Sequence, residues 1–200
     1  MVGEGDIHGL QGRGEDMDHA ARLLARSARG DRRAFDEIVT RYGPMALRVA
    51  ARLAPDRQSA EDIAQEAMVR IWRRADEFDG RRARFTTWLY RIVVNLCIDL
   101  RRRPQPVSLP ENFDPIDPAA GAAENVEVDE RRAALIEAIE ALPSGQRAAL
   151  MLVYDEGLSG AEAAQVLGVS AKAVERLLAR ARARLRELLV AEHRESEVGI

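Results

Sequence analysis

One stretch constrains the fold of this chain more than any other: residues 158–189, which read LSGAEAAQVLGVSAKAVERLLARARARLRELL. Ser159 and Glu162 have the spacing of a capping box, so a short helix should begin there. Gly168 can make the turn that ends this helix, and Ser170 can cap a second, longer one. Two helices joined by a turn of about three or four residues that contains glycine form a helix-turn-helix. The pattern predicts that motif here.

The second of these helices has a basic face. The apolar residues expected to fill the space between the two helices are Leu167, Val169, Val174 and Leu178. The opposite face presents Lys172, Glu175, Arg176, Ala179 and Arg180. Because arginine contacts phosphates and can read guanine edges in the major groove, this face is typical of DNA binding. The alternative from the pattern alone is a solvated, Arg-rich terminal helix.

The rest of the sequence favours helices over sheets. Aromatic residues make up only 4% of the chain, while Ala, Leu and Arg, which lose little on entering a helix, abound. Helices are expected over residues 17–28, 126–142 and 143–156. Gly30 should end the first helix and Asp31 should cap the next, which Gly43-Pro44 should break or kink. Another helix should begin at Ser59 and end near Asp76. Thr86 or Thr87 should cap a further helix that ends at Arg103.

Between these helical regions lies a segment of different composition. Five of the eight prolines fall between residues 104 and 118, and residues 104–130 carry seven acidic residues but no Lys or Arg. Such a composition indicates an extended linker. Residues 1–16, which are glycine-rich and show no periodicity, indicate a flexible tail. We therefore expect an all-α chain with two small helical domains, 17–103 and 126–192, joined by a flexible acidic, Pro-rich linker (104–125) and followed by a short tail (193–200).

Bulk features narrow the class of protein. The net charge of −3 hides an acidic linker and a basic C-terminal helix, so the distribution of charge matters more than its sum. The single cysteine, Cys97, excludes a disulfide framework within the chain, and no apolar run is long enough to span a membrane. The N-terminus lacks the apolar segment of a secretory signal. We expect a cytoplasmic protein that does not insert into membranes, is not an enzyme, and needs no cofactor or metal.

Two groups of polar residues in the N-terminal domain are candidates for function. Asp62 and Glu66 lie one helical turn apart; an exposed protein-binding face is favoured over a catalytic or metal-binding pair, because all three histidines lie near the termini. Between residues 78 and 103, arginines are interleaved with aromatic residues, a pattern typical of a surface for single-stranded nucleic acid. The competing interpretation places Phe85, Trp88 and Leu89 in the core, with Tyr90 less certain.

Taken together, four stretches resemble the extracytoplasmic-function (ECF) group of sigma factors, in the order found in that group. They are GDRRAFDEIVTRY (30–42), AEDIAQEAMVRIWR (60–73), FDGRRARFTTWLYRIVVNLCIDLRRR (78–103) and the segment from 141 to 185 that contains the helix-turn-helix. The run TWLYRIVVN together with Asp-x-x-Gln-Glu is the most specific part. The resemblance implies that residues 17–103 form sigma domain 2 and residues 126–192 form sigma domain 4.

The resemblance also implies roles for individual residues. Docking on the clamp coiled coil of the largest RNA polymerase subunit falls to Asp62, Gln65, Glu66, Arg70 and Arg73. Capture of a flipped base in the melted −10 element falls to Phe78, Gly80, Arg81, Arg84, Arg91 and Asn95. Reading of the −35 element as a duplex falls to Lys172, Arg176 and Arg180. The chain departs from its relatives at Lys172-Ala-Val-Glu175, where they often have Gly-Thr-Val followed by a basic residue.

Partners follow from the same resemblance. They are the RNA polymerase core, promoter DNA and an anti-sigma factor that covers both domains. A rival reading is a stand-alone helix-turn-helix repressor or activator, which would bind a palindrome as a dimer because half-site spacing mirrors protein symmetry.

Overall fold

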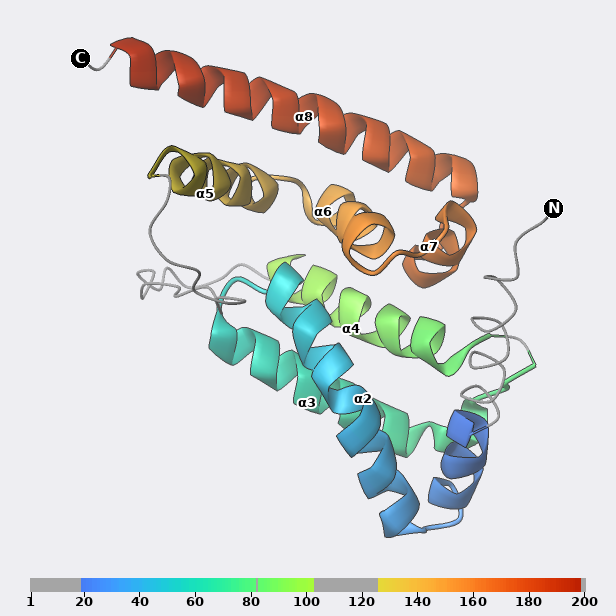
Figure 1. The fold of residues 1–200 in the computed structure, drawn as a ribbon. Helices are drawn as coiled ribbons and strands as arrows, with labels where there is room; N and C mark the ends of the chain where they lie inside the picture. Colours follow the sequence, from blue (N-terminus) through green and yellow to red (C-terminus); the bar gives the residue numbers. More distant parts are fainter. Residues whose placement is uncertain (1–18, 82, 103–125, 199–200) are drawn as a thin grey trace, which may run out of the picture. The chain divides into compact units, whose positions relative to one another are not determined.

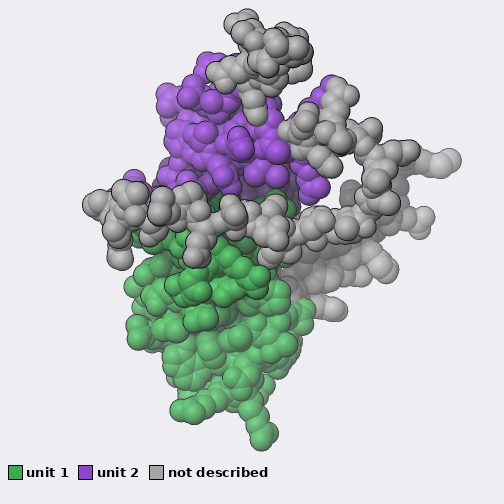
Figure 2. Space-filling model, turned by 90° about the vertical axis from the view of Figure 1, so that its left-hand side faces the viewer, with its two compact units in different colours: residues 1–100 green, residues 101–200 purple. Residues whose placement is uncertain are grey.

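The computed structural model describes residues 19–81, 83–102 and 126–198, with side chains over 19–81, 83–102 and 131–191. All regular structure within these ranges is helical, which confirms the predicted all-α class (Figure 1). The chain divides into two compact units, residues 1–100 and 101–200 (Figure 2). The predicted N-terminal tail (1–16) and the predicted linker (104–125) lie outside the described residues.

The first unit consists of a helix over residues 19–27, α2 (Arg32–Leu53), α3 (Arg57–Arg73), the short 3₁₀ turn η1 (Ala75–Glu77) and α4 (Phe85–Arg102). Its core contains large apolar side chains that are fully buried, among them Leu23, Leu24, Ile38, Ile71 and Leu89. Ile63 and Ala67 lie on the same buried face of α3 as Ile71, in keeping with their helical spacing.

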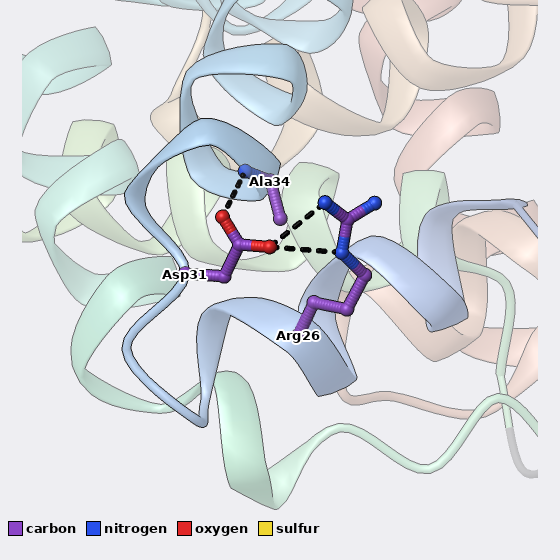
Figure 3. A network of polar contacts seen from close by, with 3 residues as sticks. All are labelled: Arg26, Asp31 and Ala34. Carbon is purple, nitrogen blue, oxygen red and sulfur yellow. Dashed lines mark hydrogen bonds and ion pairs between the residues drawn. The ribbon is translucent and has the colours of Figure 1, made fainter.

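The junction between the first helix and α2 is held by one carboxylate. Gly30 has a φ of +89°, a left-handed conformation that favours glycine, and it follows the first helix as predicted. Asp31 then caps α2 by accepting a hydrogen bond from the backbone N–H of Ala34 at 3.2 Å (Figure 3). Arg26 donates to the other carboxylate oxygen from Nε and Nη2 at 2.9 and 2.8 Å. These bonds hold the pKa of Asp31 below its ordinary value, and the hydrogen bond from Arg26 has the largest effect.

Four predicted features of the helices in this unit are wrong: the break that was offered beside a kink at Gly43-Pro44, the start and the end of α3, and the start of α4. α2 runs without a break through Pro44, because buried side chains at Ile38, Tyr42, Ala46 and Val49 keep one face packed on both sides of the proline. α3 begins at Arg57 rather than at Ser59, since Asp56 accepts from the backbone N–H of Ser59 at 2.7 Å.

The ends of α3 and the start of α4 also differ from the prediction. α3 ends at Arg73, and residues 75–77 form the separate turn η1 instead of continuing the helix to Asp76. α4 begins at Phe85, so that Thr86 and Thr87 lie inside its first turn rather than at the position before it. The buried ring of Phe85 packs edge-on against Tyr42 of α2, with ring centroids 4.6 Å apart, and this tertiary contact places the helix start.

The second unit consists of α5 (Val126–Glu140), α6 (Ser144–Leu150), the π-helical turn η2 (Met151–Asp155), α7 (Gly160–Leu167) and α8 (Ala171–Val198). Pro143 precedes α6 as predicted, and the helical segment after it reaches Asp155 through η2. α5, α6 and α7 all pack against α8. The backbone of α8 continues past residue 192, where the sequence had set the end of the domain.

Candidate DNA-binding and protein-binding surfaces

The helix-turn-helix has the local geometry that its sequence predicted. Ser159 Oγ accepts from the backbone N–H of Glu162 at 3.2 Å, and the Glu162 carboxylate accepts from the backbone N–H of Ser159 at 2.9 Å. Gly168 makes the turn with a φ of +67°. Ser170 Oγ accepts from the backbone N–H of Ala173 at 3.2 Å at the start of α8. Both helices of the motif therefore begin at a serine cap, and a left-handed glycine ends the first of them.

Packing between α7 and α8 separates the two faces of α8. Val174, Leu178 and Ala181 are buried against the rest of the unit, as is Val166 of α7. Val169 was expected in this core, yet it is 42% exposed because it lies in the turn itself, between Gly168 and Ser170. The exposed face presents the predicted residues Lys172, Glu175, Arg176, Ala179 and Arg180.

Three cations on that exposed face form a regular row. Lys172, Arg176 and Arg180 follow one another at intervals of four residues, which places them on successive turns of the same side of α8. None of them forms an ion pair with another residue whose side chain the structure describes. A row of charges about one helical turn apart can follow a phosphate backbone or reach base edges in a major groove.

α3 presents the residues predicted to contact a protein partner. Asp62, Gln65 and Arg73 are exposed, whereas Glu66 and Arg70 are partly exposed and bind each other, with Arg70 Nε donating to Glu66 Oε1 at 2.8 Å. Asp62 accepts from Gln58 Nε2 at 3.0 Å. In the described part of the chain, no three His, Cys, Asp or Glu side chains lie where they could hold a metal ion.

An apolar patch adjoins these charges, and sequence reasoning missed most of it. Trp72 is 36% exposed, and its ring packs edge-on against Phe35 of α2, with centroids 4.8 Å apart. Val69 of α3 and Val39 of α2, one turn after Phe35, are also exposed. We call these four residues the Trp72 patch. Trp72 lies two helical turns after Gln65 on α3, and this spacing was the signal in the sequence that the two residues share one side of the helix. Aromatic residues with a charged rim are typical of protein interfaces.

The predicted −10 residues lie on a loop and along one side of α4. Arg91 and Asn95 are exposed and one turn apart, and Arg84 and Trp88 precede them on the same side. The opposite side of α4, with Leu89, Val93, Val94 and Cys97, is buried. Asp79 accepts from the backbone N–H of Arg81 at 3.0 Å and from its Nε at 3.2 Å, while the Arg81 side chain is 93% exposed.

The aromatic residues of this region form a cluster. Phe78 contacts Phe85 and Trp88, with ring centroids 5.9 and 5.3 Å apart. Phe85, Leu89 and Tyr90 are buried, as core residues should be, but Trp88 is only half-buried, so its expected place in the core is wrong in part. Phe78 is likewise half-buried, and its ring packs inside the cluster. The cluster holds Phe78, which follows η1, against the start of α4.

The helix over residues 19–27 borders the same loop, and no sequence pattern indicated this. The Cα of Gly80 faces Ala21, which lies on this helix. Leu23 and Leu24 of the helix are fully buried in the unit. Gly80 therefore lies between Phe78 of the aromatic cluster on one side and Ala21 of this helix on the other.

These features define an all-helical, DNA-binding protein with a helix-turn-helix in one of its two units. The family Sigma-70 region 2 matches residues 38–106, and the family Sigma-70, region 4 matches residues 132–185. The chain belongs to the sigma-70 family, as a member of its ECF group.

Comparisons over nearly the full length agree. RNA polymerase sigma factor CnrH of Cupriavidus metallidurans is 35% identical over 188 residues, which is 89% of this chain and 97% of that protein. ECF RNA polymerase sigma factor SigM of Mycobacterium tuberculosis is 38% identical over 183 residues, covering 90% and 89%. The structure of CnrH in complex with the cytosolic domain of CnrY is similar with a TM-score of 0.62 and 31% identity, covering 86% of this chain and 98% of that one.

Membership of the sigma-70 family decides between a sigma factor and a stand-alone helix-turn-helix regulator. A stand-alone helix-turn-helix regulator would not carry both sigma-70 regions, so that rival is set aside. The chain is a sigma factor, which binds the RNA polymerase core and promoter DNA to direct transcription initiation. None of its described helices has the length and apolar character needed to cross a membrane.

Proposed function

We propose that this sigma factor contacts the polymerase and the promoter through three surfaces. The Asp62–Arg73 segment of α3 binds the clamp coiled coil of the largest polymerase subunit. The 78–84 loop with Arg91 and Asn95 captures a base of the melted −10 element, and the row Lys172–Arg176–Arg180 reads the −35 duplex. The observation that carries the proposal is that each surface includes the exposed side of a helix whose other side is buried, and that the −10 surface adds residues of the loop before α4.

The −10 surface suits a strand that has been opened. Capture of a flipped base has to offset unstacking and unpairing, which cost about a few kcal/mol. Exposed arginines at 81 and 91 neutralise the backbone, while Asn95 can donate to and accept from a base edge. We assign Phe78 a supporting role, because its ring is packed against Phe85 and Trp88 and holds the loop in place.

The α3 surface suits a protein partner. Glu66 and Arg70 neutralise each other in an ion pair, while Asp62 and Arg73 remain as exposed charges of opposite sign at two ends of the segment. The Trp72 patch beside them supplies apolar area that a partner can desolvate. We therefore add Trp72 and Val69 to the residues that dock on the polymerase.

Two weak DNA contacts on one scaffold reinforce each other through effective concentration. Because polymerase holds both units at once, the holoenzyme should bind promoters far better than the free sigma factor does. The protein acts in the cytoplasm and contributes no catalysis, cofactor or metal of its own.

An anti-sigma factor is the proposed regulator. The similar structure of CnrH was solved with the cytosolic domain of CnrY. We expect an anti-sigma partner of this chain to cover both units and so to hide the surfaces that polymerase needs. Purification from native cells should recover such a partner; recovery of polymerase alone under non-inducing conditions counts against it.

In vitro transcription with purified core polymerase on a library of promoter fragments tests the proposed function. Specific transcripts that depend on the added protein are expected. An absence of such transcripts would contradict the proposal.

A further inference from the structure

The exposed face of α8 carries one carboxylate among its cations. Glu175 is exposed and lies between Lys172, three residues earlier, and Arg176, the next residue. Ala179 follows one turn later on the same side.

Glu175 has little to contribute to α8 itself. The positions four residues before and after it are Ala171 and Ala179, and the structure shows no ion pair between Glu175 and Lys172, the cation three residues before it. A negative charge is stabilised by the helix macrodipole within the first turn, but Glu175 is the fifth residue of α8 and lies past that turn. A carboxylate on a face that meets phosphates also weakens binding in general, unless it meets a hydrogen-bond donor.

Base edges in a major groove offer such a donor. A carboxylate only accepts hydrogen bonds, so it fits the N4 amino group of cytosine and is repelled by the O6 and N7 acceptors of guanine. We propose that Glu175 is a specificity-determining residue that selects cytosine at one position of the −35 element. This inference rests on the proposed function of α8 as the reader of that element. The neighbouring cations hold the DNA, and Glu175 chooses among sequences.

The size of the effect follows from single base contacts. A good bidentate contact to a base edge discriminates against the wrong base by roughly fivefold to a hundredfold in affinity, and the single contact of Glu175 should reach the lower part of this range. We therefore expect the holoenzyme to prefer cytosine over guanine at that position by about tenfold. Positions contacted by Lys172 or Arg176 should keep their own preferences.

The test uses holoenzyme and promoters with a fixed −10 element and a randomised −35 element, sequenced after transcription. The wild-type protein should enrich cytosine at one position. Glu175→Gln should shift that position toward adenine, because an amide can both accept from adenine N6 and donate to N7. The matched control is Glu187→Gln, which changes an exposed glutamate of α8 that pairs with Arg184 at 3.3 Å; it should leave the enriched sequence unchanged.

Two results would overturn the inference. One is the same −35 preference in wild type and Glu175→Gln; the other is tighter binding of Glu175→Gln to all sequences alike, which would make the carboxylate a source of repulsion only. Arg176→Ala separates this failure from failure of the proposed function. If Arg176→Ala weakens −35-dependent transcription while Glu175→Gln changes nothing, only the role of Glu175 falls. If neither variant has an effect, α8 does not read the −35 element.

Discussion

A β-carbon placed on Gly80 would lie 3.4 Å from the β-carbon of Ala21, in ordinary van der Waals contact. The same β-carbon would lie 3.5 Å from Cε1 of Phe78. One added methyl group therefore fits at Gly80, in contact with both Ala21 and Phe78. This helix precedes the part of the chain that matches Sigma-70 region 2, yet it forms one wall of the loop proposed to hold the −10 element.

Gly80→Leu should displace the 78–84 loop. A leucine at this position meets Ala21 and Phe78, and overpacking of this kind costs roughly 1–3 kcal/mol. We expect slower promoter opening, measured by permanganate reactivity of unpaired thymines, with core binding intact. Gly80→Ala is the matched control, since its methyl group fits. Equal opening by Gly80→Leu and wild type would show that the loop does not depend on this contact.

Asn95→Ala should impair open-complex formation and leave affinity for core polymerase unchanged. Asn95 is exposed on α4, so its loss should alter the stability of the fold by less than about 0.5 kcal/mol. Permanganate footprinting measures opening, and competition with a labelled sigma factor measures core binding. Normal opening by Asn95→Ala would remove this residue from the −10 surface.

Local signals were the ones that the sequence revealed reliably. Asp31, Ser159 and Gly168 act through neighbours within a few residues, so their roles could be predicted from spacing alone. Pro44 could not be judged in this way, because the buried face that carries α2 past it depends on contacts with the rest of the unit. Local rules predict a boundary only where neither a tertiary contact nor a second local cap competes, and at the start of α3 the cap by Asp56 displaced the predicted cap by Ser59.

The candidate surfaces show the same division. Helical spacing placed Lys172, Arg176 and Arg180 on one exposed side of α8, because period alone decides which residues share a side. The contact of Gly80 with Ala21 and the packing of Trp72 on Phe35 join residues far apart in sequence. No periodicity encodes such pairs, which is why the sequence missed them.

Glu66→Arg should weaken binding to core polymerase through reversal of charge at a protein interface. The change also replaces the Glu66–Arg70 ion pair with two arginines one turn apart. This should lower the stability of α3 by about 0.2–0.5 kcal/mol, the usual magnitude for such pairs. Glu61→Arg is the control, because Glu61 pairs with Arg57 at 2.9 Å with the same spacing, nearer the start of α3. Equal core affinity of both variants would exclude Glu66 from the interface.

Trp72→Ala should reduce affinity for core polymerase by about tenfold or more, since partly exposed tryptophans are frequent hot spots of interfaces. Leu47→Ala, which shortens another exposed apolar residue of the same unit, should have little effect on that affinity. Fluorescence-detected urea unfolding measures how much of the loss comes from the broken contact with Phe35. An unchanged affinity would limit Trp72 to a structural role.

The Arg26–Asp31 contact predicts how the stability of the first unit depends on pH. The pKa of Asp31 is lowered below its ordinary value of 3.8 by the Arg26 hydrogen bond and then by the Ala34 N–H, so the folded state favours the charged carboxylate. This contribution is fully present above the ordinary pKa and is lost as pH falls through the lowered one. Asp31→Asn keeps an oxygen that can cap α2 but removes the charge, so the variant should be less stable than wild type at neutral pH and should approach it in acid.

Urea unfolding followed by tryptophan fluorescence reports on the first unit, because both tryptophans, Trp72 and Trp88, lie there. Arg26→Gln is the matched variant: it should reduce stability in the same pH range, and adding it to Asp31→Asn should cost little more, since the two residues share one contact. High salt should narrow the difference, because the pair is exposed. A gap between wild type and Asp31→Asn that stays constant from neutral pH to below 3.8 would show that the carboxylate acts only as a cap and that its charge does not matter.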